Sequence, residues 1–316
     1  MNKISLQIRS LFFSGILLSL LGSPKLYADV SPDTAPQLKM QITTGAKLTL
    51  GEPVILRAEI TNPLVGQSLW VQTGWYAADW YTLSLVDSAG NPVAALPDTR
   101  TREARGALGP SLKIVSPDST APLDIVATSY LPIPHPGKYL LKVHVQAPYA
   151  LEEVSAENFP QVQHQLKSGE TALVGDFVFP LTVGPADPSV LQSKANALVQ
   201  NIFTQTVGKS HDTDLDALFS MPEPIAWTSW QRLADKGNAD TQDRVADHLA
   251  RLHTSKAADI LFKMLDSPSG DGSFVSEKLA EIYNHGGLAL REHIKASAAQ
   301  RSVQLPEQIS VPQAID

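Results

Sequence analysis

The hydrophobic period of this chain changes once, near residues 184–188. Before this point, apolar residues alternate with polar ones over short stretches, which is typical of half-buried β-strands. After it, apolar residues recur at helical spacing, as Leu191, Ala195 and Leu198 do. One element cannot satisfy both periods, so the sequence predicts an all-β unit followed by a separate all-α unit.

The residues at the change of period mark a boundary of their own. Gly184 and Pro185 end the last alternating stretch, and Asp187 with Pro188 forms a good helix cap and first helical position. We therefore predict a β-domain over residues 29–184, a helical domain over residues 185–300 and a mobile tail over residues 301–316.

The β-domain is predicted from short alternating runs that are separated by turn residues. Val54 to Thr61 alternates after the turn Gly51-Glu52-Pro53, and Tyr139 to Val145 alternates after Pro136-Gly137. About nine strands fit a two-sheet sandwich better than an open sheet, and no helical period competes with them. The candidate strands are residues 38–43, 48–61, 69–73, 80–86, a short one around Val93, 113–115, 124–129, 138–145 and 173–183.

Three short motifs resemble bacterial immunoglobulin-like domains. Leu50-Gly51-Glu52-Pro53-Val54 and Glu59-Ile60-Thr61-Asn62 look like their early strands, and Pro136-Gly137-Lys138-Tyr139 looks like the turn into their late strand. The resemblance covers roughly half of the chain and implies an immunoglobulin-like sandwich. Such domains are mostly noncatalytic spacers or binding modules, and one group that resembles them inhibits proteases.

The helical domain carries a weak internal repeat. Beyond a first helix from Pro188, helices are predicted at residues 224–234, 240–253, 255–265, 274–284 and 288–298. Apolar positions recur thirty residues apart: Val245, Leu249 and Leu252 as Val275, Leu279 and Ile282, and Ile260 and Met264 as Leu290 and Ile294. The pattern resembles HEAT-type repeats, although any short helical bundle gives similar periodicity.

The amino terminus has the layout of a secretory signal. Lys3 and Arg9 precede an apolar run over residues 11–21, and Ala28 supplies the small residue before a cleavage site. We expect cleavage after Ala28 and a periplasmic or secreted mature protein, since the run is too short for a membrane span. The chain has no cysteine, which excludes disulfides and thiol catalysis and favours a bacterial envelope.

Charge and motif content exclude several function classes. The net charge of −7 argues against nucleic acid or anionic lipid as a partner, and no later segment is apolar enough to span a membrane. His248 and His253 are five residues apart, so they do not form a zinc-peptidase pair, and we interpret both as helix-surface residues. Serine-nucleophile elbows and phosphate-binding loops are also missing. The sequence therefore predicts no catalytic residue, no metal site and no cofactor.

An aromatic cluster is the first candidate binding site. Trp70, Trp75, Tyr76 and Trp80 lie close together in the sequence, and Tyr81 follows them. Strand alternation places Tyr81 inward and Trp80 outward, so some rings are candidates for a surface that contacts a glycan or a protein. The alternative is that these rings fill the sandwich core.

Three arginines form the second candidate. Arg100, Arg102 and Arg105 lie in a segment without a strand pattern, where a loop could grip an acidic group. A solvated loop is the alternative.

These features together predict a non-catalytic exported binding or scaffolding protein with a protein or glycan partner in the cell envelope. Two alternatives stay open. The first is an envelope enzyme that acts on glycans or peptides through carboxylates that no motif marks. The second is a protease inhibitor that presents a loop at residues 99–110.

Overall fold

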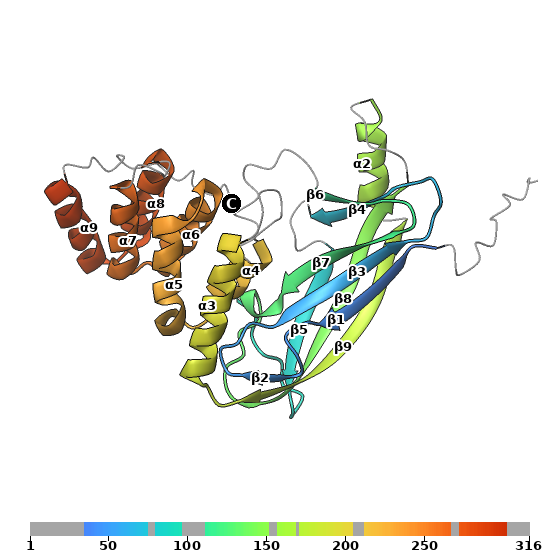
Figure 1. Ribbon diagram of the computed structural model, residues 1–316, viewed down its shortest axis with the longest axis horizontal. Helices are drawn as coiled ribbons and strands as arrows, with labels where there is room; N and C mark the ends of the chain where they lie inside the picture. Colours follow the sequence, from blue (N-terminus) through green and yellow to red (C-terminus); the bar gives the residue numbers. More distant parts are fainter. Residues whose placement is uncertain are drawn as a thin grey trace, which may run out of the picture.

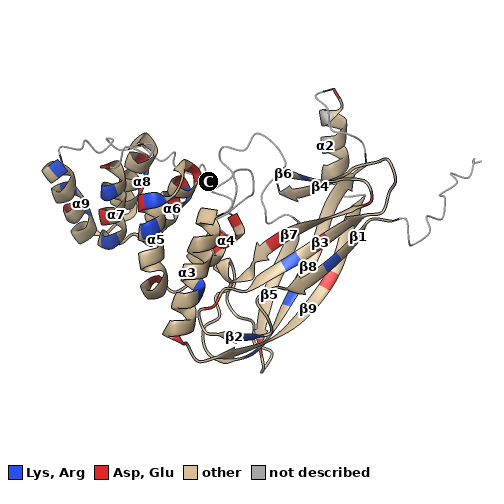
Figure 2. Ribbon diagram, viewed as in Figure 1, with Lys and Arg blue, Asp and Glu red and all other residues tan. Residues whose placement is uncertain are grey.

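The chain folds into a β-sheet domain followed by a domain of helices (Figure 1). The structure is a computed structural model, and it describes residues 35–74, 80–96, 111–151, 157–168, 171–204, 212–266 and 272–301. Acidic and basic residues are interspersed over both domains (Figure 2). None of the helices in these ranges is both long and apolar enough to cross a membrane.

The smaller sheet is antiparallel and has three strands in the order β1-β3-β7. These strands are β1 (Gln37–Ile42), β3 (Ile55–Asn62) and β7 (Ser119–Val126). In β3 every second residue is buried, as the alternation in the sequence predicts.

The larger sheet has six strands, built around the long strand β8 (Gly137–Ala150). One edge of β8 pairs with β9 (Ala172–Gly184), and the other pairs first with β5 (Tyr81–Asp87) and then with β4 (Leu69–Gly74). The edge strand β6 (Ser111–Val115) pairs with β4, and the short β2 (Lys47–Thr49) pairs in parallel with the end of β9.

The two sheets enclose one apolar core to which inward residues of both contribute, including the fully buried Leu56, Ile60 and Leu141. The predicted all-β sandwich of the immunoglobulin-like class is therefore confirmed. Tyr81 lies inward with 6% of its surface exposed, as predicted.

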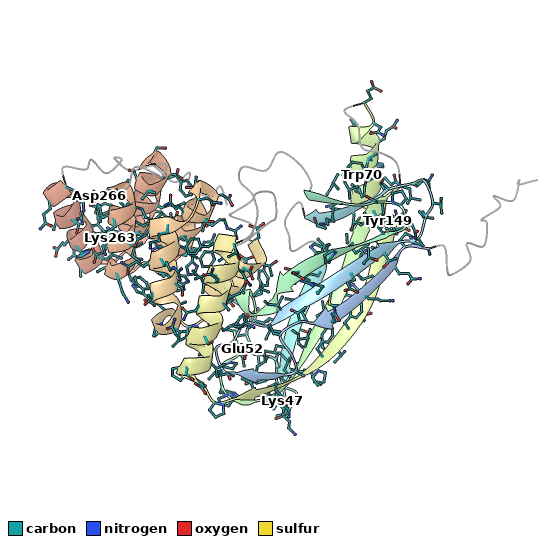
Figure 3. All side chains as sticks on the ribbon, viewed as in Figure 1. Lys47, Glu52, Trp70, Tyr149, Lys263 and Asp266 are labelled. Atoms are coloured by element: carbon teal, nitrogen blue, oxygen red, sulfur yellow. The ribbon has the colours of Figure 1, made fainter. Side chains whose placement is uncertain are left out.

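One helix interrupts the strands, contrary to the prediction that no helix lies in this half of the chain. This helix, α2 (Phe159–Ser168), packs Val162 and Leu166 on Ala150 and on the half-buried Trp70 (Figure 3). Its apolar stripe consists of these two residues one turn apart, so the sequence gives too weak a helical period to detect.

The second domain consists of seven helices in its described ranges. They are α3 (Pro188–Thr204), α4 (Asp212–Phe219), α5 (Glu223–Lys236), α6 (Ala239–Leu252), α7 (Ser255–Leu265), α8 (Gly272–His285) and α9 (Leu288–Arg301). Asp187 caps α3, because its Oδ1 accepts hydrogen bonds from the backbone N–H of Ser189 (2.9 Å) and of Val190 (3.3 Å). The all-α prediction is confirmed, and α4 is the helix that it lacked.

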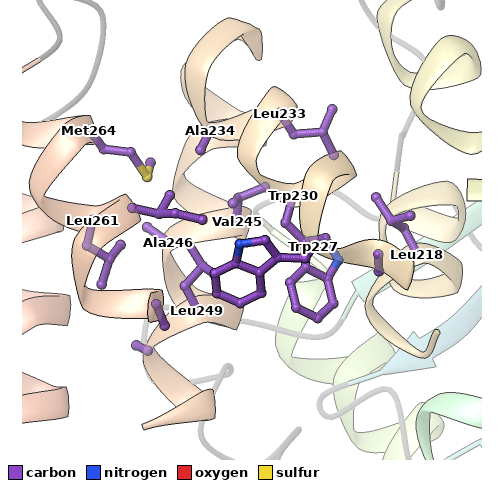
Figure 4. Packing of buried hydrophobic residues seen from close by; sticks show 14 of the residues in the cluster. Leu218, Trp227, Trp230, Leu233, Ala234, Val245, Ala246, Leu249, Leu261 and Met264 are labelled. Carbon is purple, nitrogen blue, oxygen red and sulfur yellow. The ribbon is translucent and has the colours of Figure 1, made fainter. Parts of the chain in front are cut away.

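Two tryptophans of α5 lie at the centre of the helical core (Figure 4). Trp227 and Trp230 meet edge to face with ring centroids 5.7 Å apart, and Val245 and Leu249 of α6 are fully buried in the same cluster. Aromatic pairs in this geometry add to the stabilisation from burial.

The two domains are in direct contact. Val126 of β7 is buried in the helical core, and Ile55 of β3 packs against that core. Lys194 of α3 lies 3.9 Å from the Glu52 carboxylate. At Gly51, whose φ is +93°, an added Cβ would lie 2.6 Å from Cγ of Pro222, so the two domains approach each other too closely there for any side chain.

Candidate functional site

A pocket of about 280 Å³ lies where the sandwich meets the helices. Its lining comes from both domains, and this makes it the best candidate for a binding site in the described part of the chain. The β-domain contributes Leu96 and the segment that follows β7, and the helical domain contributes the end of α4 and one face of α6. The lining residues are Leu96, Thr128, Ser129, Tyr130, Pro132, Asp216, Phe219, Ser220, Arg244, Asp247, His248 and Arg251.

Hydroxyl groups fix the wall that the β-domain supplies. Thr128 Oγ1 accepts a hydrogen bond from the backbone N–H of Val54 (3.2 Å) and donates one to Ser220 Oγ (3.0 Å). Ser129 Oγ donates to the backbone carbonyl of Asp216 at 3.3 Å. These bonds hold the 3-10 turn Ala127–Ser129 against α4, so the wall is preorganised.

Ion pairs fix the charged side of the pocket. Arg244 bridges two carboxylates of α4, with Nη1 2.7 Å from Asp212 Oδ1 and Nη2 2.8 Å from Asp216 Oδ1. Asp247 pairs with Arg251 on its own helix and with Lys278 of α8, whose Nζ lies 2.7 Å from Asp247 Oδ1. Each cation therefore has a carboxylate beside it, and the pocket is close to neutral.

The ion pairs keep Asp247 and Lys278 ionised. Burial opposes the ionisation of Asp247, but the hydrogen bond from Lys278 and the charge of Arg251 outweigh it and lower its pKa below the ordinary value. Burial likewise opposes the charge on Lys278, and the hydrogen bond to Asp247 outweighs it and raises the pKa of Lys278. Neither group is therefore suited to exchange protons near neutral pH.

His248 lies between two aromatic rings at the base of the pocket. Its ring stacks on Phe219 with centroids 4.1 Å apart and meets Trp230 edge to face at 4.5 Å. Burial, aided by the charge of Arg251, lowers its pKa to about 3, so the imidazole is neutral at pH 7. Its Nε2 is buried and has no hydrogen-bond partner.

His248 was interpreted as a helix-surface residue, but it is only partly exposed, because Phe219 of α4, a helix that was not predicted, stacks on its ring. His253, by contrast, is exposed at the carboxyl end of α6, as predicted.

Of the predicted aromatic residues that the structure describes, Trp80 and Tyr81 are in contact, whereas Trp70 lies apart from them. Trp80 is 4% exposed and packs edge to face on Tyr81 at 4.9 Å in the sandwich core, so the prediction that it lies outward is wrong. The physical reason is that β5 begins at Tyr81, and strand alternation does not extend to the residue before it. Trp70 is half-buried under α2, in a different cluster from Trp80.

The other predicted binding residues, Trp75, Tyr76, Arg100, Arg102 and Arg105, lie outside the described residues. Apart from His248, the pocket residues were not singled out from the sequence, although a signal for some of them exists. Arg244, Asp247, His248 and Arg251 recur at spacings of three and four, which places them on one face of a helix.

Across the described residues no group of three or more His, Cys, Asp or Glu side chains is placed to hold a metal ion. What the pocket offers is a fixed arrangement of aromatic surface, hydroxyl groups and compensated charges. Such a lining can bind a polar ligand through hydrogen bonds and stacking without a chemical step.

Comparison with known proteins gives similarities of fold only. No family model matches the chain, and no curated protein matches it. The CARDB domain of a Pyrococcus furiosus protein in complex with di-metal ions is 8% identical, covers 48% of this chain and 88% of that chain, and has a TM-score of 0.22. PapD-like domain 7 of human CEP192 is 11% identical, covers 55% and 100%, and has a TM-score of 0.25.

A beta-glucosidase from Listeria innocua in complex with glucose is 14% identical, covers 48% of this chain and 16% of that chain, and has a TM-score of 0.22. Similarities at this level carry no argument about ligands or activity. The functional conclusion therefore depends on the residues of this chain.

Proposed function

We propose that this chain is a non-catalytic, exported binding protein whose ligand site is the pocket between the two domains. The observation that supports this proposal best is the state of the ionisable groups that line the pocket. Asp216 and Asp247 are held in ion pairs, and His248 is held neutral by burial. A site of this kind keeps its charges fixed, which suits recognition better than proton transfer.

The lining favours a small polar ligand. Tyr130 and Phe219 offer aromatic surface, and Ser129 and Ser220 offer hydroxyl groups. The paired carboxylates can accept further hydrogen bonds, and the paired guanidinium groups can donate them. Short peptides and glycan fragments of the cell envelope have this mixture of apolar faces and hydrogen-bonding groups. We therefore propose a protein-derived or glycan ligand in the envelope.

Export is the second part of the proposal. It is supported by the basic start, the apolar run over residues 11–21 and the small residue Ala28, which is the layout of a cleavable signal. The mature chain would then begin at Asp29 in the periplasm or the medium. Amino-terminal sequencing of the exported protein should give Asp29-Val30-Ser31, whereas a cytoplasmic product that retains Met1 would contradict export.

We also propose that α6 to α9 are two copies of a helical-hairpin repeat of the HEAT-like kind. The repeat pairs Val245 with Val275 and Leu249 with Leu279, and all four side chains are buried. Ile260 and Leu290 are likewise both buried. Equivalent burial in both copies supports a repeat, because each hairpin buries its apolar face against the next.

The enzyme alternative has less support at this site. A glycosidase needs one carboxylic acid that is protonated near neutral pH, and the pKa of Asp247 is instead lowered. The inhibitor alternative depends on a loop at residues 99–110. These residues lie outside the part of the chain that the structure describes.

Filling the pocket tests the proposed site. Leu96 lies at the rim with 49% of its surface exposed, so Leu96→Trp should fill the pocket without loss of stability. Val65, which is 91% exposed and does not line the pocket, gives the matched control Val65→Trp. The probes are short peptides and N-acetylglucosamine oligomers, titrated by calorimetry.

We expect a probe that binds the wild type and Val65→Trp to bind Leu96→Trp at least about tenfold more weakly, which corresponds to about 1.4 kcal/mol. Equal binding to all three proteins would place the site elsewhere. Cleavage of a probe by the wild type, detected by chromatography, would support the enzyme instead.

A further inference from the structure

The outer edge of β1 is open. The strand pairs with β3 on one side, and no strand of the described chain pairs with it on the other. It lies at the opposite edge of its sheet from β7, the strand whose end contacts the helical domain. The helices therefore leave this edge uncovered (Figure 1).

The direction of the backbone groups at this edge follows from one hydrogen bond. The N–H of Thr43, the residue after β1, donates to the carbonyl of Ile55 at 2.9 Å. In an antiparallel pair the N–H and C=O of one residue point to the same side, and the side alternates along the strand. Leu38, Met40 and Ile42 therefore present their N–H and C=O groups to the open edge.

A groove runs along the same edge. It has a volume of about 370 Å³, and its lining includes Leu38 and Met40 of β1, Arg57 and Glu59 of β3, and Phe177 of β9. Leu38, Met40 and Phe177 are partly buried and pack against the sandwich core. The apolar core is therefore incompletely covered beside the unpaired backbone groups of β1. An added β-strand can use both features, because its backbone pairs with the edge and its side chains cover the apolar surface.

We infer that the open edge of β1 is a self-association surface, on which β1 of a second copy of this chain pairs antiparallel about a twofold axis centred at Met40. Opposed residues in an antiparallel pair lie on the same face of a sheet, so a twofold axis must place one residue opposite its own copy. With Met40 at the centre, Leu38 lies opposite Ile42 of the other copy. All three apolar residues then stay on the core side.

This register also satisfies the backbone and the charges. The residues that would form hydrogen-bonded pairs are Leu38, Met40 and Ile42, the same ones whose groups face the open edge. On the outer face, Lys39 would lie opposite Gln41 of the second copy, and no like charges would be directly opposed. A register centred at Lys39 would instead place the two lysines opposite each other.

Across the joined sheet, no two like charges would be direct neighbours on the outer face. Lys39 is in register with Glu59 of β3, and Gln41 is in register with Arg57, which is paired with Asp124 at 2.8 Å. On the outer face, Glu59 and Lys39 of one copy would therefore be followed across the interface by Gln41, Arg57 and Asp124 of the second copy. A second copy therefore matches this edge in its apolar pattern and its backbone hydrogen-bonding groups, and it brings no like charges into direct opposition.

A single cysteine tests the register, because the chain has no cysteine of its own. In Met40→Cys the two new thiols would lie in a hydrogen-bonded pair whose Cα atoms are about 5.5 Å apart, within the range of a disulfide. In the matched control Gln41→Cys, the thiols would be offset by two residues along the strands, about 7 Å, which is too far to bridge. Oxidised glutathione takes up the two electrons and two protons released on bridging.

We expect Met40→Cys to form a covalent dimer at least about tenfold faster than Gln41→Cys on a non-reducing gel. Sedimentation of the wild-type chain at about 10 to 200 µM should show a reversible dimer. A wild type that stays monomeric over this range, equal cross-linking of both variants, or cross-linking of neither would overturn the inference.

Discussion

His248 is neutral because of its surroundings rather than because of a partner. Phe219 and Trp230 enclose its ring, and the charge of Arg251 disfavours a second positive charge there. A histidine whose folded-state pKa lies below its unfolded value stabilises the fold only while it is unprotonated. Its contribution is therefore complete above pH 6.5 and is lost progressively as the pH falls toward 3.

Replacing this histidine should flatten the acid dependence of stability. Between pH 6.5 and pH 4 the wild type should lose about 3 kcal/mol of unfolding free energy through this group. In His248→Phe, which preserves stacking on Phe219 and removes the unpaired Nε2, that share of the loss should be absent. Urea unfolding at several pH values measures it.

The matched control is His164→Phe on α2, where the side chain is exposed. It should retain the acid dependence of the wild type. If His248→Phe and His164→Phe lose stability in parallel on acidification, the ring of His248 is not held neutral.

A comparison of Gly51 with Gly66 separates two contributions to the loss of stability, the strain of a left-handed backbone and the steric clash of an added Cβ. Both Gly51 (φ +93°) and Gly66 (φ +80°) have left-handed backbones, but an added Cβ meets Pro222 at 2.6 Å in the first and nothing within 4 Å in the second. We expect Gly66→Ala to cost about 1 kcal/mol and Gly51→Ala about 2 to 4 kcal/mol of unfolding free energy. Equal costs in chemical denaturation would show that Pro222 moves away easily.

Asn62 joins elements that belong to different sheets. Its buried Nδ2 donates to the carbonyls of Gln67 (2.8 Å), Val115 (3.0 Å) and Ser116 (3.2 Å), and its Oδ1 accepts from the N–H of Leu64 (3.1 Å). The end of β3 is thereby tied to the end of β6. The sequence showed only that Asn62 ends a strand.

An aspartate at this position should be at least as disruptive as an alanine. Asn62→Asp keeps the acceptor but brings a carboxylate against three carbonyl oxygens, and Asn62→Ala leaves those carbonyls without the donor. We expect each variant to lose about 2 to 4 kcal/mol of unfolding free energy. An Asn62→Asp variant that melts like the wild type would show that water replaces the donor.

The strands and most helices could be predicted because their periods depend on a few neighbouring residues. β8 and β9 alternate over long runs, and α6 and α7 carry wide apolar stripes. α4 is short, with Leu215 and Leu218 as its large buried residues, and besides the preceding helix α3 it packs on β7, which is remote in sequence. The pocket needs α4 as well as α6, so the spacing of polar residues on α6 does not by itself predict the site.

At the scale of the whole molecule, the two domains share a buried boundary. The change of hydrophobic period in the sequence separates the domains but does not reveal this contact. Val126 of β7 belongs to the helical core, and Ile55 packs against it. Removing the helices would expose both side chains to water.

A fragment of residues 29–184 should nevertheless fold, because the sandwich has its own core. We expect a strand-type circular dichroism spectrum and cooperative melting, at a lower midpoint than the sandwich has in the full chain. The exposed Val126 should lower the solubility of the fragment. Val126→Ser should raise that solubility without a further decrease in the melting midpoint, since the side chain is no longer buried. An unfolded fragment would mean that the two domains form one folding unit.

The short parallel strand β2 has a mechanical consequence. It pairs with residues 182–184 at the end of β9, and only residues 185–187 separate that end from α3. The N–H of Thr182 donates to Ala46 and that of Leu50 donates to Gly184, so β9 is held on both edges where it leaves the sheet. Tension that enters through α3 would load these bonds along the strand, in shear, so that they must break together rather than one after another.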